Sequence, residues 1–174
     1  DWSHGNTGDL LDRFEKGSIS TEVFLNAIQQ QAYLHVTLVQ LREACCALLV
    51  GFRAERIELL QSLKERYNLF LLSNTNEMHI KQVNEELARD FSVGNLQQLF
   101  THAYYSYDMQ MRKPDPAIFH RVLQEQGLSA DETLFIDDSL LNTKAAASCG
   151  LQVLHKSAEV ELCAVLPGTL GAVC

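Results

Sequence analysis

Apolar and polar residues follow two different patterns along this chain. Up to Gly51 the apolar positions have helical spacing, with Phe24, Ala27 and Ile28 on one face and a further helix expected through 38–45. From Ala54 onward, apolar runs of strand length alternate with helical segments. The expected strands are 69–72, 102–105, 134–136 and 151–154, and the expected helices among them run through 57–67, from Glu77, over 116–126 and over 140–149.

The alternation of helices and strands predicts an α/β fold with a Rossmann-like parallel sheet flanked by helices. We divide the chain into a small helical region, 8–52, and an α/β core, 53–174. The turn Gly17-Ser18-Ile19-Ser20 is expected to end one helix of the first region and to cap the next. The residues beyond 156 indicate no definite element.

Two adjacent carboxylates, Asp137 and Asp138, follow the expected strand 134–136. Open α/β sheets bind ligands at the carboxyl ends of their strands. Crowded carboxylates repel one another unless a cation lies between them, and Mg²⁺ typically takes one or two carboxylates in addition to water and phosphate. Alternatively, the acids form a helix N-terminus, where Asp caps the helix and complements its dipole. This segment alone supports both interpretations equally.

Two further segments place polar groups after apolar runs or in loops. Ser73-Asn74-Thr75-Asn76 follows the expected strand 69–72, where a hydroxyl and free backbone N–H groups can hold an anion, although these residues are also ordinary helix caps. Lys113 precedes Pro114, which keeps the lysine out of a helix. A lone lysine is usually a surface charge. The order of these groups along the chain, first the hydroxyl, then the lysine and then the acid pair, favours a binding site.

In their order and spacing, these segments resemble the haloacid dehalogenase-like (HAD) hydrolase superfamily. The resemblance covers residues 9–156 and is greatest to phosphatase-type members with a helical cap. The stretch 71–76 is similar to the second family motif, 113–119 to the third and 135–139 to the fourth. The resemblance implies that 8–52 is the cap and that 53–174 is the HAD-like core.

The resemblance also implies a role for each site residue. Ser73 would hold the transferring phosphoryl group, assisted by the backbone around Asn74. Lys113 would offset charge on the nucleophile and on the phosphoryl oxygens. Asp138 would be the main Mg²⁺ ligand, with Asp137 beside it in the metal site. These roles imply a Mg²⁺-dependent phosphatase that acts on a small phosphomonoester through an aspartyl-phosphate.

The first family motif, an apolar strand ending in D-x-D, has no counterpart in this sequence. The first Asp of that motif is the nucleophile, and the second is the general acid/base. Here the chain opens with a polar, Gly-containing stretch, 1–8, and Asp9 and Asp12 begin an amphipathic helical pattern as surface or capping residues. We therefore expect either a fragment or a descendant that lost its nucleophile, and in both cases no activity from the chain alone.

The missing strand also has a structural consequence, because in this family it lies between the strands expected at 69–72 and 134–136. Each buried backbone group left unpaired costs about 1–3 kcal/mol. We therefore expect the chain either to pair those two strands directly or to fold well only with the missing segment present.

Composition limits the other functions. The net charge of −8 argues against nonspecific binding to nucleic acid or membrane surfaces. No apolar run approaches the roughly 20 residues of a membrane span. Five cysteines without C-x-x-C spacing indicate free thiols and a cytoplasmic location. The substrate and the oligomeric state are left open.

Three function hypotheses follow. The first is the phosphatase acting on a small phosphorylated metabolite, and the alternative is a non-catalytic HAD-derived module that binds phosphate or metal or serves in interactions. The third is a dehalogenase or a phospho-receiver domain. We discount a metal-free dehalogenase because it has little use for the pair Asp137-Asp138. A receiver domain has its acid pair first and its lysine last, the reverse of the order found here.

Overall fold

The computed structural model describes residues 6–33 and 35–157. The chain divides into two compact units, Asp1–Arg112 and Lys113–Cys174, and each is described by itself. This division does not test the expected boundary between 52 and 53, which stays a prediction. Within the described residues, no helix has the length and apolar character needed to cross a membrane.

The first unit begins with three helices that share an apolar core. Phe14 and Phe24 stack with ring centroids 4.1 Å apart, and Leu25 and Leu41 are buried with them. Met78, from a later helix, completes this cluster. The expected turn is confirmed, because Ser20 caps the second helix by accepting a hydrogen bond from Val23 N. The helices are α1 (Asn6–Glu15), α2 (Thr21–Gln31) and α3 (Leu38–Cys46).

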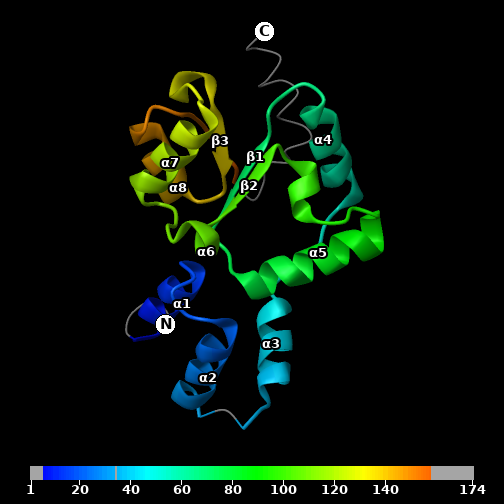
Figure 1. Cartoon of the computed structure of the whole chain (residues 1–174), viewed down its shortest axis with the longest axis vertical. Coiled ribbons are helices and arrows are strands. Elements are labelled where there is room, and N and C mark those ends of the chain that lie inside the picture. The colour runs from blue at the N-terminus through cyan, green and yellow to red at the C-terminus, as the bar shows by residue number, and fades with distance from the viewer. Residues whose placement is uncertain (1–5, 34, 158–174) are drawn as a thin grey trace. The chain divides into compact units, whose positions relative to one another are not determined.

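The rest of the first unit is a helix–strand alternation. Ile57 of one helix packs against Val83 and Leu87 of another and against Leu99 of a short 3₁₀ turn. The two strands pair in parallel, with Ser73 opposite Tyr105 (Figure 1). The elements are α4 (Ala54–Lys64), β1 (Phe70–Ser73), α5 (Glu77–Phe91), η1 (Leu96–Leu99), β2 (His102–Tyr105) and α6 (Ser106–Met109).

The second unit repeats the strand–helix alternation. Asp115 caps its first helix by accepting a hydrogen bond from Ala117 N, and Gly127 ends that helix with a left-handed φ of 61°. Its two strands pair in parallel, with Asp137 opposite His155. The elements are α7 (Pro116–Gln126), η2 (Ala130–Glu132), β3 (Leu134–Asp137), α8 (Leu140–Ser148) and β4 (Gln152–His155).

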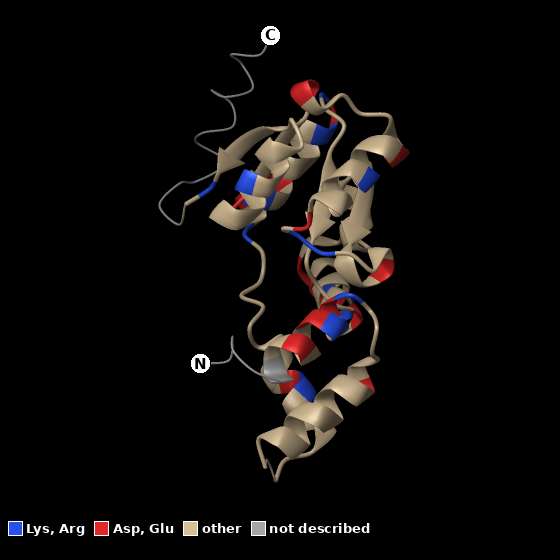
Figure 2. Ribbon diagram, turned by 90° about the vertical axis from the view of Figure 1, so that its left-hand side faces the viewer, with Lys and Arg blue, Asp and Glu red and all other residues tan. Residues whose placement is uncertain are grey.

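The described strands therefore form two parallel ladders, β1–β2 and β3–β4. Direct pairing of β1 with β3, one of the two expected outcomes of a missing central strand, is not among the ladders of the described strands. The α/β class with parallel strands is confirmed. Lys and Arg positions, like Asp and Glu positions, are scattered over the ribbon and are not confined to one element (Figure 2).

Candidate functional site

The carboxyl edge of the β1–β2 ladder holds the expected phosphate-binding residues. Ser73 is the last residue of β1, it is half-buried, and its hydroxyl has no hydrogen-bond partner among the described residues. Asn74 follows it in the loop to α5. Ser106 is fully buried and holds this loop, because it donates to Thr75 O at 3.0 Å and accepts from Thr75 N at 2.9 Å. The loops after β1 and β2 are thus tied together.

The loop ends where α5 begins. Asn76 is buried and caps α5 by accepting a hydrogen bond from His79 N at 3.0 Å. Burial lowers the pKa of His79 against the opposing effect of a hydrogen bond with the Cys45 backbone. The His79 ring is therefore kept neutral near pH 7.

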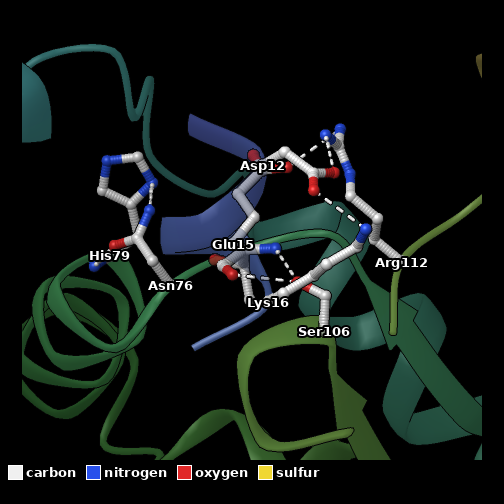
Figure 3. A network of polar contacts seen from close by, with 8 residues as sticks. Asp12, Glu15, Lys16, Asn76, His79, Ser106 and Arg112 are labelled. Atoms are coloured by element: carbon white, nitrogen blue, oxygen red, sulfur yellow. Dashed lines mark hydrogen bonds and ion pairs between the residues drawn. The ribbon is translucent and has the colours of Figure 1, made fainter. Parts of the chain in front are cut away.

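A charged network lies between α1 and the end of the first unit. Arg112 contacts two carboxylates of α1: its Nη1 is 3.3 Å from Asp12 Oδ1, and its Nη2 is 2.9 Å from Glu15 Oε2 (Figure 3). Lys16 forms a second ion pair with Asp12 at 2.8 Å. Burial raises the pKa of Glu15, and the Arg112 charge only partly offsets it.

In the second unit, the expected lysine and one expected acid form a buried ion pair. Lys113 Nζ lies 2.7 Å from Asp137 Oδ2, and the two side chains are 9% and 8% exposed. Lys113 occupies the turn before α7, outside any helix as predicted, and its peptide bond to Pro114 is cis. Its ammonium group also lies 5.4 Å from the centre of the Phe135 ring. The lysine is therefore a buried group of the unit rather than a surface charge.

The other oxygen of Asp137 is also occupied. Asp137 Oδ1 accepts hydrogen bonds from Ser139 N at 2.8 Å and from Asn142 Nδ2 at 3.0 Å. Burial tends to raise the pKa of Asp137, but these hydrogen bonds and the Lys113 ammonium outweigh burial and hold the pKa below its usual range. Asp137 is thus a fixed carboxylate near neutral pH, and Ser139, not either acid, is the cap of α8.

Asp138 differs from its neighbour in being exposed. Its backbone carbonyl lies 3.0 Å from His155 Nε2, and its carboxylate has no partner among the described residues. No group of three or more His, Cys, Asp or Glu side chains in the described residues is arranged to hold a metal ion. One open carboxylate beside one occupied carboxylate fits Mg²⁺, which keeps several waters and binds few protein ligands.

The structure brings together some of the site residues that the sequence predicts. Lys113 and Asp137 are in direct contact, with Asp138 next in the chain. Ser73 and Asn74 belong to the first unit, and their assignment, like that of the other site residues, stays a prediction.

Sequence reasoning missed two features of the first unit. Ser106 gave no signal, because a serine after an apolar run is common in turns. Asp12 was interpreted as a surface or capping residue, although it pairs with Arg112, one hundred residues away. No local pattern reports an ion pair of that sequence separation.

A family model described as haloacid dehalogenase-like hydrolase matches residues 12–150. The chain belongs to this family. The resemblance seen in the three sequence motifs is thereby confirmed, and the chain belongs to an enzyme family of hydrolases.

Three relatives illustrate this membership. The D-ribitol-5-phosphate phosphatase of Bacteroides thetaiotaomicron is 23% identical over 148 residues, which are 84% of this chain and 70% of that protein. A HAD family enzyme variant of the same organism, crystallised with magnesium and inorganic phosphate, has a TM-score of 0.83 and 32% identity, covering 88% of this chain and 76% of its own. A predicted HAD-like hydrolase of Porphyromonas gingivalis has a TM-score of 0.84 and 28% identity, covering 92% of this chain and 78% of its own.

Proposed function

We propose that this chain carries the phosphate- and magnesium-binding groups of a phosphatase that acts on a small phosphorylated metabolite. The observation that carries the proposal is the buried pair Lys113–Asp137 beside the exposed carboxylate of Asp138. A relative named for its action on a sugar-alcohol phosphate, and a structural neighbour crystallised with magnesium and inorganic phosphate, support it. Free rather than disulfide-bonded Cys45, Cys46 and Cys149 fit a proposed cytoplasmic location.

Each residue has a specific role in the proposed reaction. The unpartnered hydroxyl of Ser73 and the backbone at Asn74 bind phosphoryl oxygens, and Lys113 supplies positive charge that offsets the charge developing on them. Asp138 would hold Mg²⁺, with Asp137 beside it, and the ion would act as a Lewis acid on the phosphoryl group. The ion pair fixes Lys113 in place before the reaction, so little reorganisation is needed.

The proposed reaction proceeds through an aspartyl-phosphate. An aspartate attacks phosphorus and displaces the alcohol, a second acid protonates the leaving oxygen, and water then hydrolyses the acyl-phosphate. The printed sequence contains no apolar strand ending in D-x-D to supply these two acids. Asp12 is not a substitute, because both of its oxygens are held by Lys16 and Arg112. The helical region 8–52 is proposed to be the cap.

The first test is an assay of the 174-residue polypeptide with Mg²⁺ and an aryl phosphate. We expect no turnover above background, because the nucleophile is missing from the sequence. Turnover that is abolished by EDTA or by Asp138→Ala would contradict this expectation. The variants Asp9→Asn and Asp12→Asn would then identify which acid of α1 acts as the nucleophile.

The second test measures Mg²⁺ binding by calorimetry. We expect binding weaker than micromolar, because one open carboxylate provides few of the ligands of an octahedral site. Asp138→Asn should remove the binding that remains. The control is Asp90→Asn, which changes an exposed acid in the first unit. Micromolar or tighter binding, or binding that survives Asp138→Asn, would contradict the metal assignment.

The alternative proposal is a non-catalytic HAD-derived module that binds phosphate or metal or serves in interactions. The carboxylate of Asp137 supports it, because Lys113, Ser139 and Asn142 already occupy both of its oxygens. An assay of these 174 residues with a D-x-D strand supplied in the same polypeptide separates the two proposals: Mg²⁺-dependent turnover supports the phosphatase, and phosphate binding without turnover supports the module.

A further inference from the structure

The backbone of the second unit is held on both sides of the Asp138 Cα atom. The carbonyl oxygen of Asp138 lies 3.0 Å from His155 Nε2. The amide of Ser139, in the same peptide unit as that carbonyl, donates to Asp137 Oδ1 at 2.8 Å. In the preceding peptide unit, the carbonyl oxygen of Asp137 accepts a hydrogen bond from Lys156 N at 3.0 Å. Because each peptide unit is planar, these contacts fix the direction of the Asp138 Cα–Cβ bond.

His155 reaches Asp138 from the neighbouring strand. It is the last residue of β4, and its Cα atom lies opposite that of Asp137 in the parallel ladder. Strand β3 ends at Asp137, so the carbonyl group of Asp138 follows the end of the strand. The imidazole of His155 therefore supplies a donor to a backbone group that the ladder itself does not pair.

The direction of this hydrogen bond is set by the chemistry of its two atoms. A carbonyl oxygen can only accept, so His155 Nε2 must carry the hydrogen atom. In the neutral ring, the contact thus requires the Nε2–H tautomer, which has its own nitrogen chemical shifts. Glutamine also ends in an amide donor, whereas phenylalanine has a ring of similar size without a donor.

The chain that follows Asp138 is held by α8. Ser139 caps this helix by accepting a hydrogen bond from Asn142 N. The hydroxyl of the buried Thr143 lies 3.1 Å from Leu140 O and 3.3 Å from Ser139 O. The Asp138 carboxylate, in contrast, is exposed and has no partner among the described residues. A fixed backbone therefore carries a carboxylate that is open to a ligand.

We propose that His155 is a positioning residue for the metal ligand Asp138: its Nε2–H group holds the Asp138–Ser139 peptide unit and so fixes the direction from which the exposed carboxylate binds Mg²⁺. The inference rests on the proposed phosphatase function, in which Asp138 holds this ion. A ligand with a fixed backbone loses less conformational freedom on binding. Mg²⁺ also demands near-ideal octahedral geometry, so a misdirected ligand lowers affinity.

Two other roles for His155 fit these observations less well. A direct Mg²⁺ ligand would be an oxygen rather than a ring nitrogen, and Nε2 is already bonded to the Asp138 carbonyl. A role only in strand pairing would require a ladder contact, yet the contact lies beyond the end of β3. Residues that hold metal ligands by hydrogen bonds commonly tune metal affinity.

The test is an NMR titration of the 174-residue chain with MgCl₂ that follows the Asp138 and Ser139 amides. We expect His155→Phe to weaken Mg²⁺ binding about three- to tenfold, the effect of one hydrogen bond at an exposed site. His155→Gln, which keeps a donor, should restore most of the affinity. Without Mg²⁺, the neutral His155 ring should show the nitrogen shifts of the Nε2–H tautomer, and the β4 amides should exchange equally slowly in both variants.

The control is His120→Phe, which changes an exposed histidine of α7 in the same unit and should leave Mg²⁺ affinity unchanged. If His155→Phe binds Mg²⁺ as tightly as the parent, or if His155→Gln loses as much affinity as His155→Phe, this inference is overturned and the metal assignment stands. Binding that survives Asp138→Asn, or MgCl₂ that shifts neither amide in the parent, contradicts the metal assignment, and this inference falls with it.

Discussion

Arg112 is the last residue of the first unit, and Lys113 is the first residue of the second. The two cations form different kinds of ion pair. Lys113 faces one buried carboxylate, and both oxygens of Asp137 have hydrogen-bond donors. Arg112 is 30% exposed and is shared between Asp12 and Glu15. Arg112 Nε has no hydrogen-bond partner among the described residues, and Glu15 Oε2 has only the ion-pair contact.

The pKa shifts of the two carboxylates reflect this difference. The Asp137 side chain is buried and the Glu15 side chain is half-buried, and burial alone raises a carboxyl pKa. At Asp137, the donors outweigh burial and the pKa is lowered. At Glu15, burial outweighs the Arg112 charge and the pKa is raised. A cation together with complete hydrogen bonding lowers the pKa of Asp137, whereas a cation alone leaves the pKa of Glu15 raised.

The largest expected effect is on the fully bonded pair. Lys113→Met leaves Asp137 buried without its cation, so the free energy of unfolding should fall by about 3–5 kcal/mol. Chemical denaturation and hydrogen exchange of the β3 amides would measure this loss.

The exposed control Lys144→Met should stay within about 0.5 kcal/mol of the parent. Adding Asp137→Asn to Lys113→Met should recover part of the loss. A loss below about 1 kcal/mol in the single variant would mean that the pair is not buried in solution.

A smaller effect is expected at the incompletely bonded network. Arg112→Ala leaves Glu15 without its ion-pair partner and should cost about 1–3 kcal/mol, measured by hydrogen exchange of the β1 amides. Arg112→Lys should retain part of this stability, because one ammonium cannot reach both carboxylates with the geometry of a guanidinium. Arg89→Ala, which breaks a pair exposed to solvent, is the control and should change stability far less. If Arg112→Ala and Arg89→Ala lower the free energy of unfolding equally, the ion pairs of Arg112 stabilise the first unit no more than a solvent-exposed pair does.

The smallest effect is the pH dependence, which should have opposite signs in the two units. Because the pKa of Asp137 is lowered, its stabilising contribution is present above the ordinary Asp pKa and is lost as the pH falls through the lowered value. Because the pKa of Glu15 is raised, its contribution is present below the ordinary Glu pKa and is lost as the pH rises through the raised value. Each pKa unit corresponds to about 1.4 kcal/mol.

Unfolding measured from pH 7 to pH 3 would show these two trends. Glu15→Gln should remove the gain in stability of β1 on mild acidification, and Lys113→Met should weaken the loss of β3 stability at lower pH. The same pH dependence in both units would contradict the contrast between the two pairs.

The local elements of this protein follow from the sequence. The strand at His102–Tyr105 and the helix Pro116–Gln126 have the expected bounds, and β1, β3 and β4 differ from expectation by one residue at one or both ends. Caps explain this accuracy, because Asp115, Pro116 and Gly127 have strong preferences at helix ends. The short helix Ser106–Met109 was missed, since four residues give too little periodicity to detect.

The sequence motifs by themselves identified the HAD-like hydrolase family and the chemical types in its candidate site. Only the tertiary structure decided which groups meet. The motif could not show that Asp137 is held by Lys113 and Asn142 while Asp138 remains exposed, because adjacent residues of a strand end point to opposite sides. Nor could it show that Arg112 pairs with α1, because contacts between residues one hundred positions apart depend on packing and leave no local pattern.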